Sequence, residues 1–208
     1  MYFCSMELGK YIYPIKSSDT DGNGVLIGKH FVTVGHVIET AVICYVTIEN
    51  KTYELTKESA LVIRTNNEGR SDGYDLAVFK FEDIEPSPLV LSSSIPSIDI
   101  ELNSICYNHK SYGTISSNNI FCSPIEETWT LVQNSGHIIS VYDNYIECEL
   151  NGKLQRGNSG SPLMYGNSVV GILYGDKDGK ESSKTVLFLS SEAIARLLKN
   201  MSIDLNAT

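Results

Sequence analysis

Short apolar runs separated by turn residues recur along almost the whole chain, and this feature constrains its fold most. Residues 25–27 and 31–34 flank a Gly-Lys turn, and residues 41–48 lead through a Glu-Asn-Lys turn into residues 52–55. Runs rich in Val, Ile, Thr and Tyr that recur about every 8–12 residues are typical of a β-sandwich or of β-barrels. The same pattern predicts further strands at residues 61–63, 76–81, 104–107, 114–115, 129–132, 137–141, 145–150, 168–174 and 185–189.

Only the end of the chain has helical spacing. A serine pair offers an N-cap at residues 190–191, and four apolar residues then follow at i, i+3, i+4 and i+7 from Ile194, which predicts a helix over residues 190–201. Proline and serine cluster between residues 85 and 96, which makes this segment the best linker candidate. We therefore expect two β units, residues 1–90 and residues 91–208, with the helix in the second.

The composition excludes several classes of partner. Asp and Glu number 25 against 16 Lys and Arg, so the formal net charge is −9, whereas a protein that binds a phosphate backbone needs a basic surface. We therefore expect neither nucleic acid nor an anionic membrane as a partner. No apolar run reaches the roughly 18 residues of a spanning helix. The first seven residues also lack a basic segment, so we expect no signal peptide and a cytoplasmic location.

The cysteines and the acidic segment at residues 19–24 predict neither a disulfide framework nor a metal site. The 5 cysteines are odd in number and far apart, which favours reduced, buried thiols. Cys106 and His109 have a spacing that could hold half of a zinc site, but no second pair follows. Residues 19–24 resemble the start of a calcium-binding loop, but His30 stands where that loop needs a glutamate. We expect no metal and no cofactor.

Three segments carry residues whose chemistry suits acyl transfer. Ser159 lies in Gly-Asn-Ser-Gly-Ser-Pro, where glycines allow a tight turn that points backbone N–H groups into one small space. His36 ends an apolar strand and could supply the base that a serine hydroxyl needs. Asp75 enters another apolar strand and could orient that base. Each segment also has a simpler interpretation, as a surface loop, a core histidine and a turn aspartate.

Together these segments resemble the chymotrypsin-like serine peptidases, and the bacterial Deg-type and viral members more closely than the digestive ones. His36 stands in T-x-G-H-V, Asp75 in D-L-A-V and Ser159 in G-N-S-G-S-P, in the order that this family uses. The resemblance implies an all-β fold of two six-stranded antiparallel β-barrels with a C-terminal helix. It also implies a serine endopeptidase that uses these three residues as a catalytic triad. Backbone N–H groups of Gly157, Asn158 and Ser159 would form its oxyanion hole.

Three residues depart from the pattern of the digestive enzymes. Val37 stands where those enzymes carry a cysteine, so the disulfide beside the histidine is absent. Asn158 stands where zymogens carry an aspartate that pairs with a freshly cut N-terminus, which argues against activation by that cleavage. Ser161 replaces the second glycine of the usual G-x-S-G-G.

The resemblance places Lys153 at the floor of the primary specificity pocket, where trypsin-like members hold basic side chains with an aspartate. A lysine there would repel such side chains, so we expect poor cleavage after Lys or Arg. Lys153 and Arg156 could instead attract an acidic side chain, whereas Leu173 stands where enzymes that cut after Glu or Gln carry a histidine. We favour a small or apolar residue before the scissile bond. The substrate-binding residues that the resemblance implies are Lys153, Leu154, Arg156, Leu173, Tyr174 and Gly175.

A catalytically silent protein of the same fold, which presents its groove to a protein partner, is the alternative to an active endopeptidase. The intact order of His36, Asp75 and Ser159 favours the enzyme. An esterase of the α/β-hydrolase type would need alternating strands and helices and the order Ser, Asp, His, which this chain lacks. The partners that we expect are a protein or peptide substrate and, as a further option, a regulatory protein.

Overall fold

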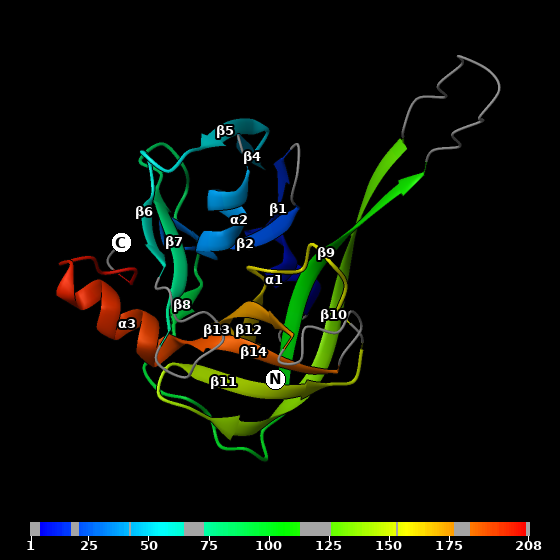
Figure 1. Ribbon diagram of the computed structural model, residues 1–208, viewed down its shortest axis with the longest axis vertical. Coiled ribbons are helices and arrows are strands. Elements are labelled where there is room, and N and C mark those ends of the chain that lie inside the picture. The colour runs from blue at the N-terminus through cyan, green and yellow to red at the C-terminus, as the bar shows by residue number, and fades with distance from the viewer. Residues whose placement is uncertain are drawn as a thin grey trace.

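Two β-sheets, one from each half of the chain, form the body of the protein (Figure 1). The computed structural model describes residues 5–17, 21–41, 43–64, 73–112, 126–152, 154–176 and 184–206. Its two barrel-like sheets and its C-terminal helix confirm the all-β fold class predicted from the sequence.

The first sheet has the strand order β5-β4-β1-β2-β3-β7-β6 and curls into a half-barrel. The β4–β5 hairpin turns at Glu49 and Asn50, whose φ angles of 49° and 68° suit a two-residue type I′ turn. Strands β3 and β7 pair with Thr33 opposite Ala77, so the residues that follow β3 lie beside the start of β7. The strands are β1 (Ile12–Ser17), β2 (Gly22–Ile27), β3 (His30–Thr33), β4 (Cys44–Ile48), β5 (Lys51–Leu55), β6 (Leu61–Arg64) and β7 (Asp75–Lys80).

The second sheet closes on itself. Its order is β12-β9-β10-β11-β14-β13-β8, and an additional β12–β13 pairing makes a closed six-stranded barrel to which the short β8 adds in parallel. The β9–β10 hairpin is long and extends away from the body of the molecule (Figure 1). The strands are β8 (Val90–Leu91), β9 (Leu102–Tyr112), β10 (Glu126–Val141), β11 (Tyr145–Leu150), β12 (Pro162–Tyr165), β13 (Ser168–Asp176) and β14 (Thr185–Ser190).

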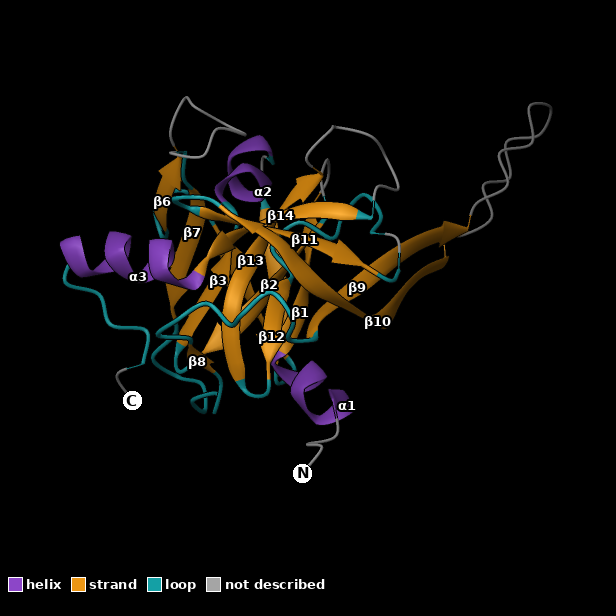
Figure 2. Cartoon of the chain, turned by 90° about the horizontal axis from the view of Figure 1, so that it is seen from below, coloured by secondary structure: helices purple, strands orange, loops and turns teal. Residues whose placement is uncertain are grey.

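The helices lie around the strands (Figure 2). The predicted C-terminal helix is confirmed as α3 (Ser191–Asn200), and the side chain of Ser190 caps it by accepting from the N–H of Ala193 at 3.1 Å. The expectation that only the end of the chain is helical is wrong, because α1 (Ser5–Leu8), the 3-10 turn η1 (Gly9–Tyr11) and α2 (Gly35–Thr40) are also present. None of the helices in the described parts of the chain is long and apolar enough to cross a bilayer.

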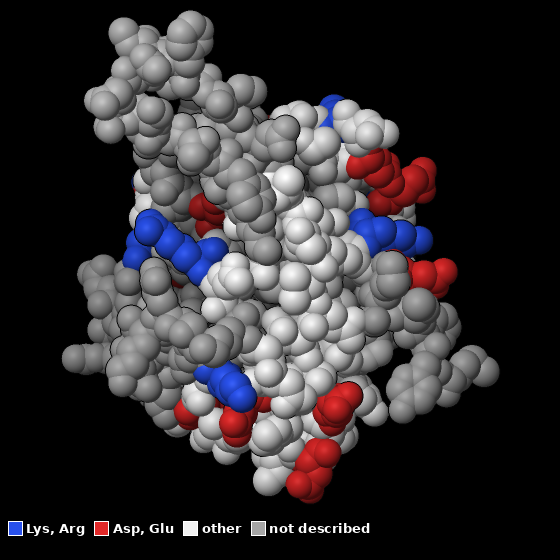
Figure 3. All heavy atoms as spheres, turned by 90° about the vertical axis from the view of Figure 1, so that its right-hand side faces the viewer, with Lys and Arg blue, Asp and Glu red and all other residues white. Residues whose placement is uncertain are grey.

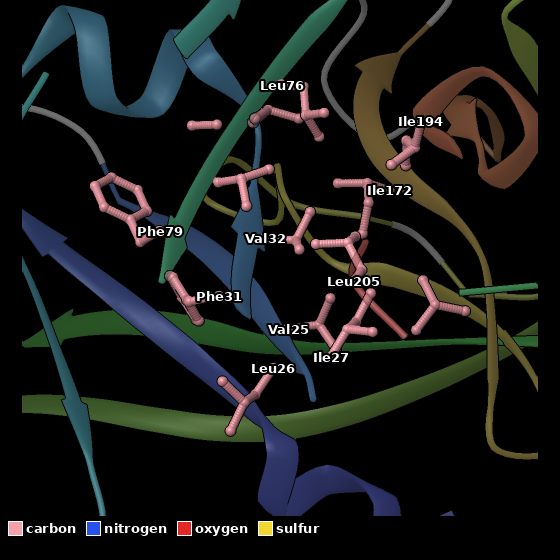
Figure 4. Close-up of a cluster of buried hydrophobic side chains, with 14 of the residues drawn as sticks. Val25, Leu26, Ile27, Phe31, Val32, Leu76, Phe79, Ile172, Ile194 and Leu205 are labelled. Carbon is pink, nitrogen blue, oxygen red and sulfur yellow. The ribbon is translucent and has the colours of Figure 1, made fainter. Parts of the chain in front are cut away.

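One hydrophobic cluster joins the two sheets. Phe31 of β3 and Leu76 of β7 enter it from the first sheet, Ile172 of β13 from the second, and Ile194 from α3 (Figure 4). Each of these four side chains is fully buried. A second cluster fills the closed barrel. The expected division into two β units, residues 1–90 and residues 91–208, stays a prediction.

Several strands differ from their predicted extents. The runs at residues 129–132 and 137–141 belong to one strand, β10, which pairs along its length with β9 and then β11. Strands β1 and β12 were not predicted from the sequence; each contains a proline, which cannot donate to a sheet ladder. The predicted strand at residues 114–115 lies outside the described residues. On the face in Figure 3, basic side chains stand in small groups between acidic ones, without a continuous basic patch among the described residues.

Candidate active site

His36 and Asp75 are brought together by the pairing of β3 with β7. The chain leaves β3 at Thr33 and enters α2, which places His36 in the first turn of that helix, while Asp75 is the first residue of β7. Asp75 Oδ1 accepts from the backbone N–H of His36 at 2.9 Å, and Oδ2 lies 2.5 Å from His36 Nδ1. The carboxylate is 1% exposed, so this buried charge is held by both the helix N-terminus and the imidazole.

The contact between Nδ1 and the Asp75 carboxylate assigns the tautomer of His36. A carboxylate can only accept, so the Nδ1 atom carries the proton and the lone pair of Nε2 remains free. The His36 side chain is 28% exposed, so Nε2 can reach a substrate or a neighbouring hydroxyl. An imidazole in this state can act as a general base.

Ser159 lies in the loop between β11 and β12, residues 151–161, here called the serine loop. Hydrogen bonds connect this loop to both sheets. The Ser159 carbonyl accepts from the N–H of Asn23 in β2 at 2.7 Å, and the N–H of Gly160 donates to the carbonyl of Leu173 in β13 at 2.8 Å. Gly160 has a φ of +86°, and a Cβ there would lie 1.9 Å from the Asn23 carbonyl oxygen. Only glycine fits this position, which explains one glycine of the motif.

Ser159 and His36 lie beside the same residue, Tyr174 of β13. The Ser159 Oγ is 3.5 Å from the Tyr174 carbonyl oxygen, and the rings of His36 and Tyr174 have their centroids 6.0 Å apart. A Cβ added at Gly22 would lie 2.7 Å from Val37 Cγ1 and 3.4 Å from the Ser159 carbonyl oxygen. Gly22 of β2 therefore lies between the helix that carries His36 and the loop that carries Ser159. Among the described residues, no hydrogen bond joins Ser159 to His36.

Two of the three N–H groups expected in the oxyanion hole are available. The N–H groups of Gly157 and Ser159 have no hydrogen-bond partner among the described residues, and Gly157 has a φ of +92°. The N–H of Asn158 already donates to the carbonyl of Gln155 at 3.1 Å. The one backbone donor of Asn158 is thus used inside the turn in this arrangement, and the contribution of the three residues to an oxyanion hole stays a prediction.

The residues expected in the specificity pocket divide into two groups. Leu154 is 9% exposed and Leu173 is 2% exposed, and both side chains pack in the cluster inside the closed barrel, so they offer a substrate little surface. Arg156 is exposed, and Tyr174 and Gly175 are half-buried. Lys153 lies outside the described residues.

A second His–Asp pair was missed by the sequence interpretation. His109 Nδ1 lies 2.6 Å from Asp21 Oδ2, and its ring stacks on Trp129 with the centroids 4.6 Å apart. A Cβ at Gly157 would lie 3.3 Å from the Cβ of Asp21, so this pair adjoins the serine loop. Residues three apart on a strand face opposite sides, which explains why Cys106 is fully buried instead of sharing a metal with His109. The stacking follows from the β9–β10 register, His109 opposite Trp129, which the sequence does not give.

The three cysteines in the described parts of the chain are poor nucleophiles. Burial raises the pKa of Cys44 to about 11, and of Cys106 and Cys148 to about 12, so these thiols stay protonated at neutral pH. His30 is 8% exposed in β3. Its pKa is lowered by burial first and by the Lys80 charge second. No group of three His, Cys, Asp or Glu that could hold a metal is present in the described parts of the chain.

Comparison with known proteins gives a family and a fold. The family model described as Trypsin matches residues 9–195, and no curated protein was found to match. Rv3671c from M. tuberculosis H37Rv, in an inactive mutant form, is 16% identical, with a TM-score of 0.62 over 95% of this chain and 89% of that chain. The serine endoprotease from Yersinia pestis is 17% identical, with a TM-score of 0.63 over 97% of this chain and 68% of that chain. The scabies mite inactivated protease paralogue S-D1 is 11% identical, with a TM-score of 0.64 over 93% of this chain and 92% of that chain.

Proposed function

The chain belongs to the trypsin family of serine proteases, and on this premise we propose that it cleaves peptide bonds through an acyl-enzyme formed on Ser159. The observation that carries the proposal is the His36–Asp75 pair, in which the carboxylate accepts from both the backbone N–H and the ring Nδ1 of His36. Such a pair sets up one free imidazole nitrogen, and both the His36 ring and the Ser159 hydroxyl lie beside Tyr174. Membership of this family implies protein or peptide substrates.

In the proposed reaction, Ser159 Oγ attacks the scissile carbonyl while His36 Nε2 takes the hydroxyl proton. His36 then gives this proton to the leaving amine, and a water molecule activated in the same way hydrolyses the acyl-enzyme. Asp75 keeps the ring oriented and stabilises the imidazolium that forms. The free N–H groups of Gly157 and Ser159 are the proposed donors to the developing oxyanion.

The Ser159 hydroxyl must turn before it can react. Its contact with the Tyr174 carbonyl oxygen, at 3.5 Å, is at the outer limit of hydrogen bonding and therefore weak. A rotation about χ1 moves a serine hydroxyl between staggered positions at small cost. We propose that substrate binding selects the position in which this hydroxyl meets His36 Nε2.

Labelling with a fluorophosphonate probe tests this assignment directly. We expect the parent protein to be labelled on Ser159, as identified by peptide mass spectrometry, and Ser159→Ala to lose the label. Ser161→Ala is the matched control, since Ser161 belongs to the same loop but is fully buried and donates to the Asn158 carbonyl. His36→Ala and Asp75→Asn should lower the labelling rate and kcat by several orders of magnitude with the fold intact. Equal labelling of the parent protein and Ser159→Ala would refute the proposal.

A catalytically silent binding module is the second candidate. The observation that favours it is the Ser159 hydroxyl itself, which contacts the Tyr174 carbonyl instead of His36. Under this alternative, the folded parent protein takes up no fluorophosphonate and releases no product in a peptide library. A covalent adduct on Ser159 excludes the alternative.

We further propose that cleavage after Lys or Arg is poor. The proposal rests on the place that the family resemblance gives to Lys153 and on the exposed, positively charged Arg156 in the serine loop. Two cations near a substrate side chain repel another cation. An unbiased peptide library should give cleavage after small or apolar residues, and a product set dominated by Lys or Arg would contradict this preference.

A further inference from the structure

A buried asparagine of the first sheet holds the serine loop of the second. Asn23 lies in β2 with no exposed surface, although it is polar. Its Nδ2 donates to the Gly157 carbonyl at 2.8 Å and to the Tyr107 carbonyl at 3.1 Å, and its Oδ1 accepts from the Tyr107 N–H at 2.7 Å. A buried amide with both donors used is satisfied only in this one arrangement.

A second buried amide completes the same network from inside the loop. Asn158 Nδ2 donates to the Tyr107 carbonyl at 3.2 Å and to Asn108 Oδ1 at 2.7 Å. Asn158 Oδ1 accepts from the Gln155 N–H at 2.6 Å. Both asparagine side chains therefore meet on one carbonyl of β9, and the turn from Gln155 to Asn158 is fixed between them.

The peptide bond between Gly157 and Asn158 is held at both ends as a result. Its carbonyl oxygen accepts from Asn23 Nδ2 at 2.8 Å, and its N–H donates to the Gln155 carbonyl at 3.1 Å. Rotation of this peptide would break both bonds and leave the fully buried Nδ2 of Asn23 with one donor unpaired, which costs roughly 1–3 kcal/mol. With this peptide fixed, the N–H groups of Gly157 and Ser159 on either side keep their directions and remain free.

We propose that Asn23 is a positioning residue that keeps the Gly157 and Ser159 N–H groups in an arrangement able to bind an oxyanion. The residue acts from the opposite sheet and touches no substrate atom. Its backbone N–H also donates to the Ser159 carbonyl at 2.7 Å, so one residue holds the loop at two points. The network is built from neutral amides and backbone groups, and so it needs neither an ion pair nor a cleaved chain terminus. This inference rests on the proposed peptidase activity.

Asn23→Asp is the sharpest test, because it changes one NH2 group into an oxygen. The variant keeps an acceptor for the Tyr107 N–H but points an oxygen at the Gly157 and Tyr107 carbonyls. Loss of one oxyanion-hole donor lowers kcat by about 100- to 1,000-fold, so partial misplacement should lower it by roughly 10- to 100-fold with KM nearly unchanged. A peptide aldehyde with the sequence of the substrate should bind weaker by the same factor, while the product peptide binds equally.

The pH dependence of activity distinguishes a positioning role of the Asn23 side chain from a mere loss of its packing. The carboxyl group that Asn23→Asp introduces can, once protonated, again donate to the Gly157 carbonyl, so the activity of this variant relative to the parent should rise as the pH falls. Asn206→Asp is the matched control, since Asn206 bonds both the N–H and the carbonyl of Leu91 and does not contact the serine loop. It should keep the kcat of the parent. Asn23→Ser, which is too short to reach Gly157, should lose activity at every pH.

The outcomes distinguish this inference from the proposed function. If the parent is labelled on Ser159 and Asn23→Asp keeps the kcat and the aldehyde affinity of the parent, the positioning role is overturned while the peptidase assignment stands. Unfolding of both Asn23 variants, measured by circular dichroism, would also overturn it, because Asn23 would then only build the fold. If the parent itself is not labelled, the proposed function fails and the positioning role fails with it.

Discussion

The two His–Asp pairs of this protein differ in burial, and burial decides what each can do. Asp75 is 1% exposed, whereas Asp21 is 28% exposed and its partner His109 is 19% exposed. A buried carboxylate must keep its donors, because leaving it unpaired costs several kcal/mol. The Asp75 carboxylate is therefore the more costly of the two to leave without its donors, because water reaches part of Asp21.

His30 gives a prediction on the pH dependence of stability. Its pKa in the folded protein is lowered, by burial first and by Lys80 second, so the unfolded chain takes up a proton at a higher pH than the folded one. The stability that the neutral His30 contributes is therefore fully present above a pH of about 6.5, the ordinary histidine value. This contribution is lost as the pH falls toward the lowered pKa of the folded protein. We expect His30→Gln to lose less thermal stability than the parent between pH 7 and pH 5, as measured by calorimetry. The same loss in both proteins would contradict this.

The catalytic candidates could be predicted from the sequence because each belongs to a short local motif. Ser159 lies in a glycine-rich turn, and His36 and Asp75 each adjoin an apolar strand. Asn23 could not be predicted in this way, although it is conspicuous as a polar residue in an apolar strand. Its side-chain partners lie 84 and 134 residues away, and only the assembled sheets bring them together. The two sequence-distant amides that converge on Tyr107 are therefore a tertiary feature with no local signal.

At the scale of elements, helix α2 shows why local sequence patterns do not predict the secondary structure next to the candidate site. The apolar residues around His36 continue the alternation of β3, so a strand was expected to end there. Val34, at the N-cap position, makes no side-chain cap, and Asp75 instead accepts the first-turn N–H from 39 residues away. Helix α3, by contrast, carries its own cap and amphipathic spacing in ten residues, and the sequence predicted it within one residue at each end.

The cap of α3 can be tested by itself. The Ser190 side chain accepts from the Ala193 N–H at 3.1 Å and is 1% exposed. We expect Ser190→Ala to lower the free energy of unfolding by about 1 kcal/mol, and Ser190→Asp, which keeps a cap acceptor, to lose less. Urea unfolding followed by circular dichroism measures both. A larger loss for the aspartate would show that its burial, and not capping, controls this position.

At the scale of the whole molecule, the shared hydrophobic cluster predicts that both sheets unfold together. Ile172 of β13 is fully buried against side chains of β3, β7 and α3. Leu102 of β9 is equally buried, but only in the cluster inside the closed barrel. If each sheet folded by itself, Leu102→Ala would destabilise the second sheet and leave the first unchanged.

We expect one transition instead. Ile172→Ala and Leu102→Ala should each lower the free energy of unfolding by about 2–5 kcal/mol, with tryptophan fluorescence and far-UV circular dichroism changing together. The chain has one tryptophan, Trp129 in β10, so fluorescence reports on this part of the second sheet and on its contact with Lys16 of β1, while circular dichroism reports on all strands. Two separate transitions in Leu102→Ala, with fluorescence changing first, would show that the halves are independent units. Coincident transitions would mean that the serine loop and the His36–Asp75 pair are held together by a single cooperative core.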